Sequence, residues 1–151
     1  MSFDLARLHR GEWFVGAGSV ALLASMLLLP WYGGSHTIDG WNALTSFRWL
    51  VVVTLVLAGA MLFFQATRRA PAIPVTLDLF VAVLGALTAA WLVYRVAIDP
   101  VGGRQVGGWI GLAGALAIAY GGFDAMRREG IEPGDSPAVI PTVDPYAQER
   151  T

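Results

Sequence analysis

Two groups of polar residues have side chains that could bind a ligand. His36, Asp39 and Asp99 offer an imidazole and two carboxylates, which a divalent cation accepts as ligands. Their spacing matches no metal-binding motif, and two separate segments would have to converge. The alternative is a loop residue at His36, a helix cap at Asp39 and an ion pair between Asp99 and Arg95. We therefore predict no metal, with His36 and Asp39 as the candidates if a site exists.

The second group combines arginines with tryptophans. Its members are Arg48, Arg95, Arg104, Trp31, Trp41, Trp49 and Trp109. A guanidinium binds phosphate or carboxylate through two parallel N–H groups. We interpret the tryptophans as anchors at a membrane interface and the arginines as side chains that extend toward water. The alternative is a basic, aromatic rim for an anionic headgroup or substrate, with Arg48, Arg95, Arg104 and Trp41 as candidate ligand-binding residues.

Familiar catalytic motifs are missing from the sequence. There is no phosphate-binding loop, HExxH, GxSxG or dinucleotide fingerprint, and there is no cysteine. The glycines at 107, 108 and 111 lie inside an apolar run, where helix packing explains them better than phosphate binding. We expect no enzyme and no cofactor. An enzyme that uses His36 and Asp39 stays as an alternative.

Apolar segments must position these residues. The chain has 151 residues, of which 56% are hydrophobic and 14% charged, whereas about a quarter are charged in soluble domains. A helix needs roughly 20 apolar residues to cross a membrane. The pattern predicts an all-α fold, an antiparallel four-helix transmembrane bundle in residues 1–128, followed by a disordered Pro-rich cytoplasmic tail at 129–151. The predicted spans are about 13–30, 48–67, 75–96 and 107–125.

Arginines indicate the orientation of the bundle. Under the positive-inside rule, both termini are predicted to be cytoplasmic. The arginines on that side are Arg7, Arg10, Arg68, Arg69, Arg127 and Arg128. Between the first two spans, Pro30 ends a helix, Trp31 and Tyr32 mark the outer interface, and Asp39 caps a helical lead over 40–48. The net charge of −1 gives no reason to expect nucleic acid.

Small residues at helical spacing predict where the helices touch. Such residues let two backbones approach closely in a membrane. The candidates are Ala17, Ala21 and Ser25 in the first span, Gly59 in the second, and Gly107, Gly111, Ala115 and Gly121 in the fourth. The fourth span carries small residues on two faces, so we place it at the centre of the bundle.

Several segments resemble a known group of proteins. LLPWY, DGWNALTSF, LVYRVAIDPVGG and GGWIGLAGALAIAYGGFDAMRREG occur in this order. Together they resemble uncharacterised four-span integral membrane proteins of actinobacteria and their relatives, over nearly all of the chain before the tail. The most specific part is YRxxxDP at 94–100, with the glycine-rich fourth span. The resemblance implies the fold, the topology and a multi-pass location in the bacterial plasma (inner) membrane, but no activity.

The function expected is non-catalytic. The small-residue stripes predict a scaffold or accessory subunit in the lipid bilayer, which packs against a second copy or a larger membrane protein. The alternative is an oligomeric channel or carrier, or a lipid- or anion-binding protein, that uses the arginine and tryptophan rim.

Overall fold

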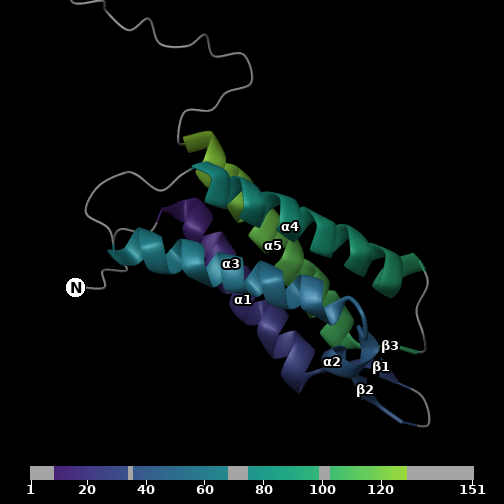
Figure 1. Cartoon of the computed structure of the whole chain (residues 1–151). Helices are drawn as coiled ribbons and strands as arrows, with labels where there is room; N and C mark the ends of the chain where they lie inside the picture. Colours follow the sequence, from purple (N-terminus) through teal and green to yellow (C-terminus); the bar gives the residue numbers. More distant parts are fainter. Residues whose placement is uncertain (1–8, 34–35, 68–74, 99–102, 129–151) are drawn as a thin grey trace, which may run out of the picture.

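The computed structural model describes residues 9–33, 36–67, 75–98 and 103–128 (Figure 1). The predicted tail at 129–151, Asp99, Arg7, Arg68 and Arg69 lie outside these residues. The elements are α1 Arg10–Leu28, β1 Pro30–Gly33, β2 Ile38–Asp39, α2 Gly40–Ala43, α3 Arg48–Thr67, α4 Val75–Val93, the π-helical turn η2 Tyr94–Ile98, β3 Gly103–Arg104 and α5 Val106–Arg128.

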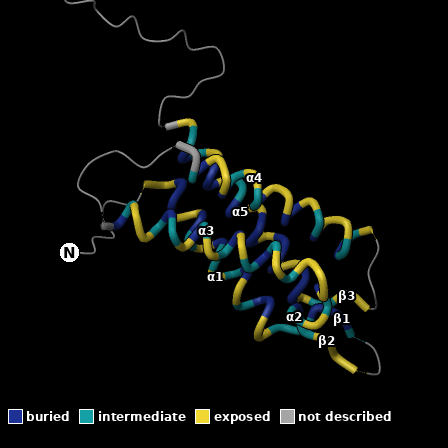
Figure 2. The backbone as a smooth tube through the Cα atoms, viewed as in Figure 1, coloured by how far each residue is buried: buried dark blue, intermediate teal, exposed yellow. Residues whose placement is uncertain are grey.

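Four of these helices are long and apolar enough to cross a membrane. They are α1, α3, α4 with its extension η2, and α5. The predicted spans fall on these four helices. Exposed positions run along the outer sides of the helices (Figure 2). Large apolar residues such as Val20, Leu28 and Val56 are among the exposed ones. An apolar outer surface suits lipid as the surrounding medium.

The four long helices form a closed ring in which neighbours run antiparallel. α1 packs on α5, α5 on α4, α4 on α3, and α3 on α1. Gly11 near the start of α1 lies against Gly121 near the end of α5, and Gly85 of α4 lies against Ala119 of α5. The start of α1 and the end of α5 therefore share one end of the bundle, opposite the strands (Figure 1).

A small antiparallel sheet closes the other end, which the sequence did not predict. β1 lies in the middle, between β2 and β3. Pro30 pairs with Asp39 on one side, and Tyr32 pairs with Arg104 on the other. The residue before a proline is pushed out of the helical region. Leu29 accordingly takes extended angles, φ −109° and ψ 143°, and the chain leaves α1 as a strand.

Facing glycines hold α1 and α5 at backbone distance. A Cβ placed on Gly18 would lie 2.6 Å from the carbonyl oxygen of Gly114, and one placed on Gly114 would lie 2.7 Å from that of Gly18. Two helical turns away on each helix, Gly11 and Gly121 meet in the same way. No side chain fits between these backbones, so the contact requires glycine on both helices.

α5 meets α4 on a second face. A Cβ on Gly85 would lie 2.8 Å from the backbone nitrogen of Ala119, and one on Gly122 would lie 2.8 Å from that of Ala82. α5 therefore approaches one neighbour through Gly114 and Gly121 and the other through Ala119 and Gly122. The prediction that the fourth span carries two packing faces agrees with these contacts.

α3 is attached differently, by side chains. The hydroxyl of Thr54 lies 3.1 Å from that of Thr88 on α4, and both residues are buried. Gly59 was predicted as the close-approach point of this helix, but a Cβ placed there would meet no atom within 4 Å. That prediction was wrong for the single chain, because Gly59 faces outward and is exposed.

The glycine contact can be tested by two substitutions on α1. Gly18→Ala should lower the free energy of unfolding by about 1–3 kcal/mol, because its methyl group collides with the α5 backbone. Gly16→Ala is the matched control, since the nearest atom to its Cβ is Leu62 Cδ1 at 3.5 Å, an ordinary contact. The measurement is thermal unfolding in detergent followed by circular dichroism. Equal losses for the two variants would contradict the close approach.

Candidate functional site

The predicted packing residues divide between the inside and the outside of the bundle. All four predicted packing residues of α5 are buried. On α1, Ser25 is buried, Ala21 is half-buried and Ala17 is exposed. The face of α1 that meets α5 carries Gly11 and Gly18 instead. Ala17 therefore takes no part in this contact. The four α5 residues are Gly107, Gly111, Ala115 and Gly121.

Trp31 occupies the core under the sheet, although it was predicted to lie at the membrane interface. Its side chain is 1% exposed, and its Nε1–H donates a hydrogen bond of 2.8 Å to the carbonyl oxygen of Ser25. Gly40, Gly107 and Gly111 surround the indole: a Cβ on any of them would lie 2.6–2.7 Å from a ring atom. We call these three residues the glycine cradle. Because the cradle encloses Trp31, this residue is not part of any outer rim.

Two of the three rim arginines lie at one corner of the sheet. Arg104 is exposed, and its Nη2 donates a hydrogen bond of 2.9 Å to the carbonyl oxygen of Ala97 in η2. Tyr32, which pairs with Arg104 across the sheet, donates from its hydroxyl to the carbonyl oxygen of Arg95, at 2.9 Å. This corner ties the sheet to the end of α4, and the hydrogen bond to Ala97 fixes the guanidinium of Arg104.

Arg48, the third rim arginine, lies in a different environment. It is half-buried at the first position of α3, and its Cζ lies 5.3 Å from the ring centre of Trp41 and 5.8 Å from that of Trp49. We call Arg48, Trp41 and Trp49 the arginine clamp. A short break precedes α3, where Thr45 takes a left-handed φ of 32°. The predicted helical lead over 40–48 is thus interrupted, and this bend places α2 with Trp41 beside Arg48.

The metal candidates His36 and Asp39 do not form a ligand set in the described chain. His36 is exposed, and Asp39 accepts a hydrogen bond of 2.6 Å from Nδ2 of Asn42. Asp39 precedes α2 as predicted, but its carboxylate accepts no backbone N–H there. Among residues 9–33, 36–67, 75–98 and 103–128, no three His, Asp or Glu side chains gather where they could hold a metal ion.

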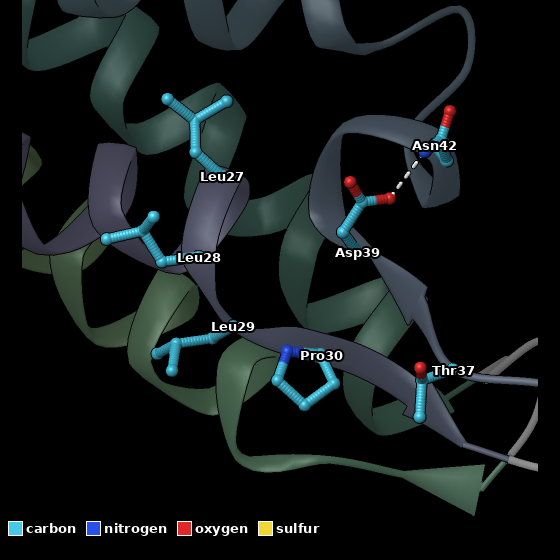
Figure 3. A pocket seen from close by; sticks show the side chains of 7 residues that line it. All are labelled: Leu27, Leu28, Leu29, Pro30, Thr37, Asp39 and Asn42. Carbon is cyan, nitrogen blue, oxygen red and sulfur yellow. Dashed lines mark hydrogen bonds between the residues drawn. The ribbon is translucent and has the colours of Figure 1, made fainter.

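Asp39 also borders a hollow of about 440 Å³ (Figure 3). Leucine side chains from the end of α1 lie on one side, and Asp39 and Asn42 project from the opposite side. The lining residues are Leu27, Leu28, Leu29, Pro30, Thr37, Asp39 and Asn42. The hollow thus has one apolar wall and one polar wall.

An aromatic groove between α3 and α4 was missed by sequence reasoning. Phe47 stacks on Trp91 with ring centres 3.6 Å apart and an angle of 14°, and Tyr94 lies 5.6 Å from Trp91. With Leu50, Leu87 and Ala90 they line an apolar groove of about 460 Å³. No sequence signal could reveal it, because Phe47 lies in the turn before α3 and its partners come from another helix.

The structure buries two carboxylates at the end opposite the sheet. Asp78 in the first turn of α4 is 0% exposed and Glu12 in the first turn of α1 is 4% exposed. The Glu12 carboxylate accepts a hydrogen bond of 2.8 Å from the backbone N–H of His9. At this position a carboxylate satisfies a free helix donor and stabilises the start of α1.

Comparison with protein-family models, curated proteins and solved structures yields no match. Of the candidate ligand-binding residues, the structure brings together Arg48 and Trp41, whereas Arg95 and Arg104 lie at the corner between the sheet and η2.

Trp31 can be tested against a surface tryptophan. Trp31→Phe removes the N–H that bonds Ser25 and leaves a gap in the glycine cradle, so it should cost about 1–3 kcal/mol of unfolding free energy. Trp109→Phe should change little, because Trp109 is 47% exposed. Thermal unfolding in detergent measures both. A larger loss for Trp109→Phe would show that the core under the sheet is not built around Trp31.

Proposed function

We propose that this protein is a small non-catalytic integral membrane protein, a scaffold or accessory subunit that packs against a second copy or a larger membrane protein. Gly59 carries the proposal. Glycine in the interior of a helix costs about 1 kcal/mol relative to alanine. Gly18, Gly85 and Gly114 have a reason within the chain, since each lies against another backbone. Gly59 has no such neighbour.

The surroundings of Gly59 support a contact with another helix. Val56 and Phe63 lie on the same face of α3, at spacings of three and four, and are 63% and 54% exposed. The missing side chain of Gly59 leaves a notch between them. A notch of this kind lets a second helix approach closely in lipid, where small residues mark helix contacts.

Association of the purified protein tests the proposal. The natural chain, extracted in mild detergent, should form a complex with itself or with a membrane protein, measured by light scattering after size exclusion. Gly59→Leu should abolish this complex and keep the helix content. Ala113→Leu, at an exposed position of α5, is the control. A natural chain that is monomeric and co-purifies with nothing would contradict the proposal.

The location and orientation belong to the same proposal. We place the chain in the bacterial plasma membrane, with the sheet outside and both termini in the cytoplasm. Arg10 and Arg127 lie at the end opposite the sheet, and Arg7, Arg68 and Arg69 are close to that end in sequence. This excess of arginine supports the orientation under the positive-inside rule.

The absence of natural cysteines allows a direct test of orientation. A membrane-impermeant maleimide should label His36→Cys in intact cells, because His36 is exposed at the sheet end. It should label Ser2→Cys only after the membrane is opened. The opposite labelling pattern would show that the bundle is inserted the other way round.

Binding of a lipid or another anion is the second candidate function. The observation that favours it is the arginine clamp, in which a cation contacts two rings and has no anionic partner among the described residues. An oligomeric channel or carrier would need the same clamp to receive an anion. The arginine clamp is therefore the part of the predicted rim that best fits an anionic ligand.

A further inference from the structure

Within the part of the chain that the structure describes, the Arg48 guanidinium contacts two aromatic rings. Its Cζ lies 5.3 Å from the Trp41 ring centre and 5.8 Å from the Trp49 ring centre, within the range of a cation–π contact. Trp41 comes from α2 and Trp49 from α3, so the clamp joins two elements. Such contacts fix the position of a guanidinium, but a ring does not replace an oxygen atom as the acceptor of its N–H hydrogen bonds.

Within the described residues, no oxygen accepts a hydrogen bond from Arg48. Its Nε is buried and has no hydrogen-bond partner. Arg104 at the same end of the bundle shows the contrast, because its Nη2 donates to the carbonyl oxygen of Ala97. Buried N–H groups are almost always satisfied in folded proteins. Nε itself is closed to a ligand, but no described residue accepts from the terminal Nη groups either, which leaves them for the acceptor oxygens of a ligand.

The electrostatic surroundings of the clamp favour an anion. Arg48 opens α3, whose first turn contains no acidic residue and carries the positive end of the helix dipole. Asp39, the nearest acidic residue in sequence among the described ones, accepts its hydrogen bond from Asn42 instead. The positive charge of Arg48 is thus not neutralised by a carboxylate of its own loop.

We propose that the arginine clamp binds a phosphate group, with the phosphodiester of a membrane phospholipid or a free phosphate as its source. The guanidinium presents paired N–H donors that match two phosphate oxygens. Trp49 is 60% exposed at the sheet end of a long apolar helix, which suits an indole at the level of lipid headgroups. This assignment deepens the second candidate function above and rests on the membrane location.

The test uses the full chain in detergent and native mass spectrometry, with phosphatidylglycerol as the lipid probe. The natural protein should retain phosphatidylglycerol. Arg48→Gln should weaken this binding at least about tenfold, as expected for a lost charged hydrogen bond. Arg48→Lys should weaken it less, because it keeps the charge and loses the paired donors. Arg104→Gln is the control and should bind as the natural protein does.

A second arm distinguishes the two sources of phosphate. Glycerol 3-phosphate and inorganic phosphate are added as competitors. If neither displaces phosphatidylglycerol at millimolar concentration, the lipid is the ligand; if either displaces it through Arg48, a free phosphate is. Circular dichroism of each variant checks the fold. Binding that is unchanged in Arg48→Gln, or that falls equally in Arg104→Gln, overturns the site.

The result is separable from the proposed subunit role. Association through Gly59 involves the outer face of α3, whereas lipid retention is measured per chain. If the chain associates but binds lipid independently of Arg48, only the phosphate site is contradicted. If lipid binding depends on Arg48 but the chain stays monomeric, only the subunit role is contradicted.

Discussion

The contact between the backbones of α1 and α5 sets the geometry of the bundle. Gly18 and Gly114 face each other so closely that neither helix has room for a side chain at these positions. Gly11 and Gly121 repeat this contact two turns away. In lipid there is no hydrophobic force to draw helices together, so close packing has to supply the attraction. α4 packs on the second face of α5, and α3 contacts both α4 and α1, which closes the ring.

The same glycine-rich helix also determines what the sheet end can present. Gly107 and Gly111 at the start of α5 make room for the indole of Trp31, and Tyr32, the next residue, bonds the turn that ends α4. Two loops that are far apart in sequence are thereby joined into one cap. Of the predicted rim, Trp31 thus lies inside the cap and Arg104 is bonded to it, whereas Arg48 contacts the indoles of Trp41 and Trp49.

Much of this architecture could be read from charge and hydropathy, since uncharged runs give the position of each long helix. The sheet could not, because strands of two to four residues show no period. The face of α1 was assigned from a spacing of four at Ala17, Ala21 and Ser25. The glycines repeat at seven, at Gly11 and Gly18, and a spacing of seven returns to the same face after two turns. The burial of Trp31 could not be predicted either, because Gly40 and the two α5 glycines of the glycine cradle come together only in the folded chain.

The pairing of α1 with α5 has a consequence for biogenesis. The tightest interface of the bundle joins the first helix to be synthesised with the last of the long ones. While the ribosome is still translating the middle of the chain, the glycine face of α1 has no partner of its own. In a membrane, α1 would therefore have to persist without its partner, exposed to degradation or mispairing, until translation has delivered α5.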